Sequence, residues 1–513
     1  MIAYLGRRFS VLLVILFGSS FILYNLAAVS GDPLEGLRGS LDPKAKATMA
    51  SLTRNLNLNV PPPARYFIWL KGIFGVFTGH INFGNTRTGE AVTTDLSHAI
   101  PTTIRLILMA TVIAIVLGIA FGIVSALRQY SRFDYAMTFV AFLMYSLPIF
   151  WVAVLLKQYL AIGFNNFLEK PTIPLPVIIV SSLISGLFWG AVIGGERRKV
   201  QMIFASATLV TAAMTTFLSV TKWFGDPGLG PIMIFGLGVG IAFTVTFIST
   251  GLTNRPALKA SLAMAVIGLA LYYPNQWLFK KHSGTGLIIL MAVATLLIAA
   301  LVGRGFAKID RRPVMRTSMI TAFLIGILTF ADRLMQNWIP YSSSDAINGR
   351  PVPTIGEANT LLDSGNYWFT TLDTVMHLLL PTIALTLISF AAYIRYSRGT
   401  LLEVLNQDYI RTARAKGLTE RTVIMRHAFR NTLIPLTTII VVDFASIIGG
   451  AIITERVFGW RGMGTLFNTA ITSFDLNLLM GVFFVTSSLA VLANLAADLL
   501  YSALDPRIRV VGK

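Results

Sequence analysis

The ionisable side chains within apolar stretches are the residues of this sequence best placed for chemistry. Asp332, Arg333, Asp443 and Asp498 fall inside or at the edges of stretches long enough to cross a bilayer. A charge in the membrane interior is costly and is often functional, as in proton-coupled carriers. Because only Asp443 lies well inside such a stretch, we expect these groups to anchor helices to one another and not to contact a substrate.

The residue pattern does not support other reaction chemistries. No GxxxxGK[ST] phosphate loop occurs, so we expect that this chain binds no ATP. The absence of cysteine excludes disulfides and thiol ligands, and the five histidines form no metal-ligand spacing, so we expect no bound cofactor or metal. No Ser/His/Asp arrangement stands out, and we predict that the chain is not an enzyme.

The densest charge cluster is basic and lies between two long apolar stretches. It occupies residues 408–435, DYIRTARAKGLTERTVIMRHAFRNTLIP, and holds Arg411, Arg414, Lys416, Arg421, Arg426, His427 and Arg430. Such a cluster cannot lie in hydrocarbon, so it must be a loop on one face of a membrane. The alternative to a functional loop is a solvated basic loop near anionic lipid, where each Lys or Arg contributes on the order of 1 kcal/mol.

Local signals predict that this basic loop is structured. Ala413 and Gly417 share one helical face and would leave a shallow notch for another surface. Gly417 suits a helix C-terminus, and Thr419 is a candidate N-cap of a second helix. Leu418 could pack onto Val423 as a hydrophobic staple. We therefore expect a short basic helix, a sharp turn and a second helix that enters the membrane.

Composition indicates a polytopic helical membrane protein. The 513 residues are 55% hydrophobic and 13% charged. Their mean hydropathy is +0.70, and apolar runs of about 20 residues recur throughout. The net charge of +19 could indicate nucleic-acid binding. However, the basic residues lie in short loops between apolar runs, which is the positive-inside pattern, so we expect lipid contact and no nucleic acid.

The order of residues in the basic loop resembles a known family. R-T-A-R-A-K-G-L followed by R-H-A-x-R-N-x-L-x-P is similar to the cytoplasmic coupling loop of ABC-importer permeases of the dipeptide and oligopeptide type. The general ABC-importer consensus has an acid where Arg411 stands and a shorter spacing than that from Gly417 to Pro435. Both departures fit the peptide-type subfamily. The start of the chain, residues 100–103 and residues 455–464 (ERVFGWRGMG) also resemble this family.

The resemblance implies roles for individual residues of the loop. ATPase coupling would fall to Asp408, Tyr409, Arg411, Thr412, Ala413, Arg414, Ala415, Lys416, Gly417 and Leu418. Transmission of motion into the membrane would fall to Arg426, His427, Arg430, Asn431 and Pro435. Residues that line a translocation path are not indicated.

The resemblance covers residues 1–170 and 370–513 and implies a type I ABC-importer core of six helices, with about six further helices inserted. Residues 1–170 would hold core helices one to three and an outer loop at 31–100. Residues 340–513 would hold helices four to six and the cytoplasmic loop 396–430. We expect the core spans at 9–29, 102–127, 135–161, 373–394, 431–453 and 476–501.

The segment 171–339 has no counterpart in the resemblance. It is expected to contribute spans at 174–194, 201–222, 229–251, 257–274, 285–303 and 317–338. An even number of spans returns the chain to the outer face, and the basic loops within the segment alternate accordingly. We expect a peripheral bundle that packs on the core, with both chain termini cytoplasmic in a bacterial cell membrane.

Two local features concern helix packing. Gly118 and Gly122 form a GxxxG spacing that permits close contact between membrane helices. Pro148 falls within the third core span and should kink it.

The resemblance implies a permease subunit of an ATP-driven importer for peptides. Its partners would be a homologous second permease, two ATP-binding subunits that use ATP and Mg²⁺, and an extracytoplasmic substrate-binding protein. The resemblance does not identify the transported substrate, because the family's relatives also carry nickel and glycosides. The alternatives are an ion-gradient-driven secondary transporter, for which no internal repeat is visible, and a membrane enzyme or scaffold.

Overall fold

The computed structural model of the chain describes residues 2–39, 43–307, 311–362 and 365–504. Over these residues the secondary structure is helical, apart from one isolated β-bridge between Asn85 and Ala91. Nine helices in the described residues are long and apolar enough to cross a membrane, or up to eleven if two bent helix pairs count as spans. The predicted all-helical, polytopic membrane fold is confirmed.

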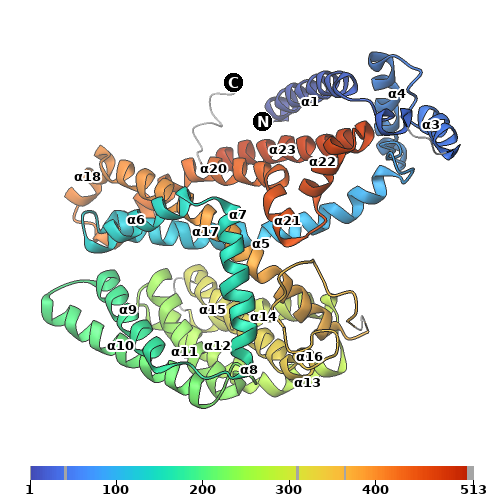
Figure 1. Ribbon diagram of the computed structural model, residues 1–513. Helices are drawn as coiled ribbons and strands as arrows, with labels where there is room; N and C mark the ends of the chain where they lie inside the picture. Colours follow the sequence, from blue (N-terminus) through green and yellow to red (C-terminus); the bar gives the residue numbers. More distant parts are fainter. Residues whose placement is uncertain (1, 40–42, 308–310, 363–364, 505–513) are drawn as a thin grey trace.

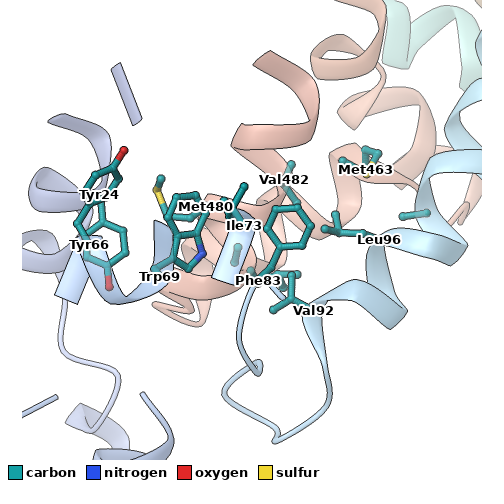
Figure 2. Close-up of a cluster of buried hydrophobic side chains, with 13 residues drawn as sticks. Tyr24, Tyr66, Trp69, Ile73, Phe83, Val92, Leu96, Met463, Met480 and Val482 are labelled. Carbon is teal, nitrogen blue, oxygen red and sulfur yellow. The ribbon is translucent and has the colours of Figure 1, made fainter. Parts of the chain in front are cut away.

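The N-terminal part places one long helix beside several short ones. These are α1 (Ile2–Ser30), α2 (Glu35–Arg38), α3 (Pro43–Asn55), α4 (Pro62–Phe74) and the 3-10 turn η1 (Gly75–Thr78). One face of α4 buries Tyr66 and Trp69 against Tyr24 of α1, and Figure 2 shows these rings side by side. Phe83 and Met480 extend the same cluster towards the C-terminal helix, which fixes α1 and α4 to the rest of the bundle.

The helices of the proposed core come from both ends of the sequence. The first group is α5 (Val92–Leu127), α6 (Arg132–Ser146), α7 (Ile149–Leu155), the π-helical η2 (Leu156–Ile162) and α8 (Gly163–Glu169). The second group is α17 (Tyr367–Leu405), α18 (Asp408–Ala415), α19 (Glu420–Thr422), the π-helical η3 (Val423–Ala428), α20 (Phe429–Gly450), α21 (Ile452–Phe458), α22 (Met463–Thr472) and α23 (Leu476–Leu504).

The segment 171–339 folds into a second set of helices. They are α9 (Leu175–Ile193), α10 (Arg197–Val220), α11 (Gly230–Ser249), α12 (Arg255–Ala270), α13 (Tyr272–Lys281), α14 (Thr285–Phe306), α15 (Arg311–Met335) and α16 (Trp338–Ser342). The helices fall close to the ranges expected from the sequence. The expected span 257–274 is a pair, α12 and α13, that bends by 50°.

The molecule has two layers of helices, as Figure 1 shows. One layer holds α1, α5, α6, α17, α20 and α23, and the other holds α9 to α15. The helix α7–η2–α8 runs crosswise from the first layer to the second. The first turns of α17 also join the layers, because Trp368 and Leu372 are buried with Phe279, Leu334 and Trp338.

One end of the bundle collects the basic turns, and we call it the basic end. Arg128, at the α5–α6 turn, donates hydrogen bonds to carbonyls at the end of α9. Arg421, between α18 and α20, does the same at the end of α11. Ala257 at the start of α12 packs with Ala307 and Val314 beside the α14–α15 connection. The basic loops that the sequence places on one face therefore lie together.

Two expected helices are longer than their apolar stretches. The second span begins at Val92 and not at 102, so the expected outer loop 31–100 ends within α5. The fourth span extends from Tyr367 to Leu405, so the first part of the expected loop 396–430 is helical. The cause is the same in both cases: a helix can continue beyond the bilayer, where hydropathy no longer marks it.

The expected third span, 135–161, is not a single crossing. α6 ends at Ser146, and the helix that follows Pro148 leaves it at 101°. Proline has no N–H to donate to the preceding turn and disfavours helical geometry in the residue before it. The expected kink is therefore confirmed at Pro148, but it redirects the chain towards the second layer.

In the first layer, α5 and α17 cross in close contact. A methyl group at Gly118 would collide with Tyr393, and one at Gly122 would collide with Ser397. The Ser397 hydroxyl donates to the carbonyl oxygen of Gly118 at 3.1 Å across the interface. The GxxxG expectation is confirmed, and it places α17, which leads into the basic loop, firmly against α5.

Candidate functional site: the basic elbow

The basic elbow, residues 408–435, comprises α18, α19, η3 and the first turns of α20. A short connection after α17 turns the chain so that α18 lies across the basic end of α5 and α17. Ile410 and Ala413 of α18 are buried together with Ala126 of α5 and Leu401 of α17. Val423, from the returning arm of the elbow, completes this small hydrophobic cluster. The elbow is thus folded onto the helix ends and is not a loose loop.

The turn of the elbow is closed by a Schellman motif at Gly417. The N–H of Gly417 donates to the Arg414 carbonyl at 2.9 Å, and that of Leu418 donates to the Ala413 carbonyl at 3.4 Å. Gly417 has a φ of +74°, which glycine adopts at little steric cost. The expected helix end at Gly417 is therefore present.

A charged pair joins the two arms of the turn. Arg414 donates to Glu420 through Nη2 at 2.7 Å and through Nε at 3.2 Å. The hydrogen bond from Arg414 lowers the pKa of the Glu420 carboxyl below its ordinary value. Both side chains are about half exposed, so the pair orders the turn more than it stabilises the fold.

Two local expectations need correction. Thr419 has extended N-cap backbone angles, but its hydroxyl pairs with that of Thr422 at 2.9 Å and caps no N–H. Leu418 is 40% exposed and is not part of the buried cluster that holds Val423, so the expected staple contributes little. Because Val423 packs against α18 itself, a staple is not needed to set the angle of the turn.

A further contact ties α18 to the base of α20. The side-chain amide of Asn431 donates to the Tyr409 hydroxyl at 2.8 Å. Tyr409 is one of the residues expected to meet an ATPase, and Asn431 is one of those expected to carry motion. The two expected groups are therefore in direct contact.

The remaining expected residues divide by exposure. Those exposed on the elbow are Asp408, Arg411, Thr412, Ala415, Lys416, Arg426, Arg430 and Pro435. His427 and Asn431 are half-buried. Ala413 is buried by the chain's own helices, so the expected notch is not open to a partner at this residue. Gly417 stays open, since no atom lies within 4 Å of the position that a β-carbon would occupy there.

A partly buried ion pair lies behind the elbow and supports it. The Asp134 carboxylate of α6 accepts hydrogen bonds from Arg398 of α17 at 2.7 and 2.9 Å. It also accepts one from the Ser125 hydroxyl of α5 at 2.5 Å and one from the Tyr130 N–H at 3.0 Å. One carboxylate thus joins α5, α6 and α17, a joint that sequence reasoning missed because Arg398 lies 264 positions from Asp134 in the chain.

Sequence reasoning also underestimated residues 455–464. The sequence gives this stretch only a resemblance to the family, but in the structure it begins within α21 and reaches α22. Glu455 is fully buried and accepts from the Thr103 hydroxyl at 2.7 Å and from the Thr465 N–H at 2.8 Å. A side chain at Gly462 would collide with both Glu455 and Thr103. These residues lock α21 and α22 onto α5.

The charges within the spans act as anchors where the structure describes them. The Asp332 carboxylate accepts from the N–H groups of Leu229 and Gly230 at the start of α11, at 2.7 and 3.1 Å, and from the Tyr272 hydroxyl at 2.7 Å. Arg333 stacks on Trp368, 5.3 Å from the ring centre.

Of the remaining two acidic residues, the structure describes the side chain of Asp443 but not that of Asp498. Asp443 of α20 lies beside the Tyr393 hydroxyl of α17. The side chain of Asp498 and the expected cytoplasmic C-terminus at 505–513 lie outside the described residues.

The fold and the elbow together define a class: a helical membrane protein that presents an ordered basic helix–turn–helix at one end. A family model described as "Binding-protein-dependent transport system inner membrane component" matches residues 118–510. The chain therefore belongs to this family, and its fold contains the type I ABC-transporter membrane core.

Similar proteins carry names from peptide transport. An oligopeptide transport system permease protein of Mycobacterium tuberculosis is 36% identical over 188 residues, which is 37% of this chain and 55% of the relative. One of Bacillus subtilis is 43% identical over 143 residues, 28% of this chain and 45% of the relative. A dipeptide transport system permease protein of Escherichia coli is 42% identical over 147 residues, 29% and 42% of the two chains. The chain spans about half the length of these curated relatives.

Proposed function

We propose that this chain is the transmembrane permease subunit of an ATP-driven importer of peptides. The observation that carries the proposal is the basic elbow, which is internally braced, packed on α5 and α17, and continuous with the membrane helix α20. A partner that grips the exposed face of α18 can therefore move a membrane helix without first ordering a loop. Family membership and the names of the relatives support the same function.

The proposed assembly follows from the resemblance of the basic loop and from family membership. The chain's sequence has no phosphate-binding loop, so ATP and Mg²⁺ would be bound by two partner ATPase subunits. A homologous second permease would complete the transmembrane path, and an extracytoplasmic binding protein would deliver the peptide. The basic end would then be cytoplasmic, in line with the positive-inside rule, with both termini on that side of a bacterial cell membrane.

We also propose a division of the chain into core and insertion. Residues 1–170 and 340–513 would form the permease core, and 171–339 would form an inserted peripheral bundle. In support, the helices of 171–339 form the second layer of Figure 1.

The proposed mechanism is alternating access driven from the elbow. Closure of the ATPase pair would displace α18, and the Tyr409–Asn431 contact would pass this displacement to α20. The π-helical turn η3 lies between the two helices. Such turns often occur at functional sites, and η3 is placed to act as the hinge. The membrane helices would then rock as rigid bodies between inward- and outward-open arrangements.

Co-purification tests the proposal. A tagged chain expressed together with its proposed partner subunits should co-purify with two ATPase subunits and a second permease. The reconstituted complex should take up peptide only with ATP and the binding protein. Peptide uptake by the isolated chain, driven by an ion gradient without ATPase subunits, would overturn the proposal in favour of a secondary transporter.

A further inference from the structure

Two arginines of the first layer cap helices of the second layer. Arg128 donates to the Ala191 carbonyl of α9 at 3.1 Å and also to that of Ile193. Arg421 donates from Nη2 to the Phe247 and Ile248 carbonyls of α11 at 2.7 and 3.1 Å. The last four carbonyls of a helix have no intrahelical partner, and they form the negative end of the helix dipole. A guanidinium therefore suits both sites.

The two caps differ in what they connect. Arg128 directly follows α5, which is held by the GxxxG crossing and by the Asp134 joint. Arg421 lies inside the elbow, between Gly417 and the π-helical turn η3. In the residues that the structure describes, the hydrogen bonds between residues 408–435 and the segment 171–339 are both made by Arg421.

The end of α11 is shaped to receive this arginine. Gly251 follows the helix with a φ of +87°, and its N–H donates to the Thr246 carbonyl at 2.8 Å. A side chain at Gly251 would collide with the Arg421 guanidinium. The absence of a side chain at this position therefore leaves the space that the guanidinium fills.

We infer that Arg421 is a positioning residue that fastens the elbow to α11, so that the 171–339 segment restrains the coupling movement. This inference rests on the proposed function of the elbow. If α18 and its turn move relative to α11, the two hydrogen bonds from Arg421 must break. The segment would thereby hold the elbow in its resting position and oppose ATP hydrolysis in the absence of peptide.

The test uses the complete transporter reconstituted in lipid nanodiscs. Arg421→Ala should raise ATP hydrolysis measured without the binding protein by about threefold to tenfold, the effect of two partly exposed charge-assisted hydrogen bonds. Arg421→Lys should give an intermediate rise, because an ammonium keeps the charge but not the planar fork. The matched control is Arg128→Ala, which removes the same kind of cap outside the elbow and should leave this rate unchanged.

A double-mutant cycle isolates the contact. In Gly251→Asn, the asparagine can adopt a positive φ, but its side chain displaces the Arg421 guanidinium. This variant should therefore raise ATP hydrolysis without the binding protein as Arg421→Ala does. Combining the two substitutions should add nothing further, because the contact is already lost. Additive effects, an unchanged rate in Arg421→Ala, or an equal rise in Arg128→Ala would each overturn the inference.

A distance measurement covers the case in which a variant assembles poorly. The natural chain has no cysteine, so spin labels can be attached at Leu418→Cys and Leu252→Cys, both exposed positions on the two sides of the contact. Arg421→Ala should lengthen and broaden the label–label distance distribution, and an unchanged distribution would contradict the inference. If the complex hydrolyses ATP at a rate that Arg421→Ala does not change, only this inference is refuted. Failure to recover any ATPase subunit refutes the proposed function.

Discussion

Gly417 is the residue whose backbone most constrains the basic elbow. Its left-handed conformation closes the Schellman motif, and a side chain at this position costs about 1–2 kcal/mol. We expect Gly417→Val to reduce ATP-dependent peptide uptake strongly while the amount of protein in the membrane stays normal. Uptake of a labelled peptide and immunoblots of membrane fractions measure the two quantities.

The matched variant for this position is Gly417→Asn. Asparagine tolerates the left-handed region far better than valine, and the space around Gly417 is open. Gly417→Asn should therefore keep most of the uptake. Normal uptake in Gly417→Val would refute the role assigned to this turn.

Tyr409 offers a second test at the level of a single group. Tyr409→Phe removes the hydroxyl that accepts the hydrogen bond from Asn431 and changes little else. Such a bond is worth about 0.5–1.5 kcal/mol, so uptake should fall by no more than about tenfold while ATPase subunits still co-purify. The ratio of peptide transported to ATP hydrolysed should drop, because force on α18 no longer reaches α20 fully. An unchanged ratio would rule out transmission through this pair.

Among the elements, the α5–α17 crossing sets where the elbow is presented. Gly122→Ala places a methyl group against Ser397, and overpacking of this kind costs about 1–3 kcal/mol. We expect a lower melting temperature in detergent. Size-exclusion chromatography of samples heated to increasing temperatures measures it. Gly240→Ala is the control, since no atom lies within 4 Å of the added methyl position in α11. Equal melting temperatures for the two variants would show that this crossing does not limit stability.

Some features of the helices could be predicted from the sequence, and others could not. Apolar runs placed most membrane helices to within a few residues, because hydropathy reports directly on the bilayer. The same signal missed the polar ends of α5 and α17, which continue the helix beyond the apolar run. Gly417 was predictable because a local backbone rule applies to it. The Asp134–Arg398 and Glu455–Thr103 contacts were not, because each joins residues hundreds of positions apart.

For the whole molecule, the arrangement of the two layers was beyond sequence reasoning. The sequence predicts a kink at Pro148, but only the packed structure gives the 101° turn that sends the chain to the second layer. The partners of Arg421 are backbone carbonyls, which leave no mark in the side-chain sequence of α11. The apolar runs of residues 171–339 predict helices, yet nothing in their sequence indicates contact with the elbow.

Residues on the two flanks of the 171–339 segment are in direct contact, which makes its removal feasible. Just before the segment, the Asn165 amide donates to the Val352 carbonyl at 2.9 Å and accepts from the Val352 N–H at 3.1 Å. A short Gly/Ser linker from 170 to 340 could therefore close the gap. We expect the excised chain to reach the membrane and to co-purify with ATPase subunits, because the α5–α17 crossing and the elbow's hydrophobic cluster contain no residue of the segment.

Excision should also reduce stability and leave a functional signature. Trp368 and Leu372 lose Phe279, Leu334 and Trp338 from their cluster, so the melting temperature should fall. Trp368→Ala in the full chain measures that packing loss alone and should leave ATP hydrolysis without the binding protein unchanged. The excised chain should instead hydrolyse ATP faster, as Arg421→Ala does, because α11 is absent. Failure of the excised chain to assemble, with Trp368→Ala assembling normally, would show that the segment is required to build the permease and does not only restrain it.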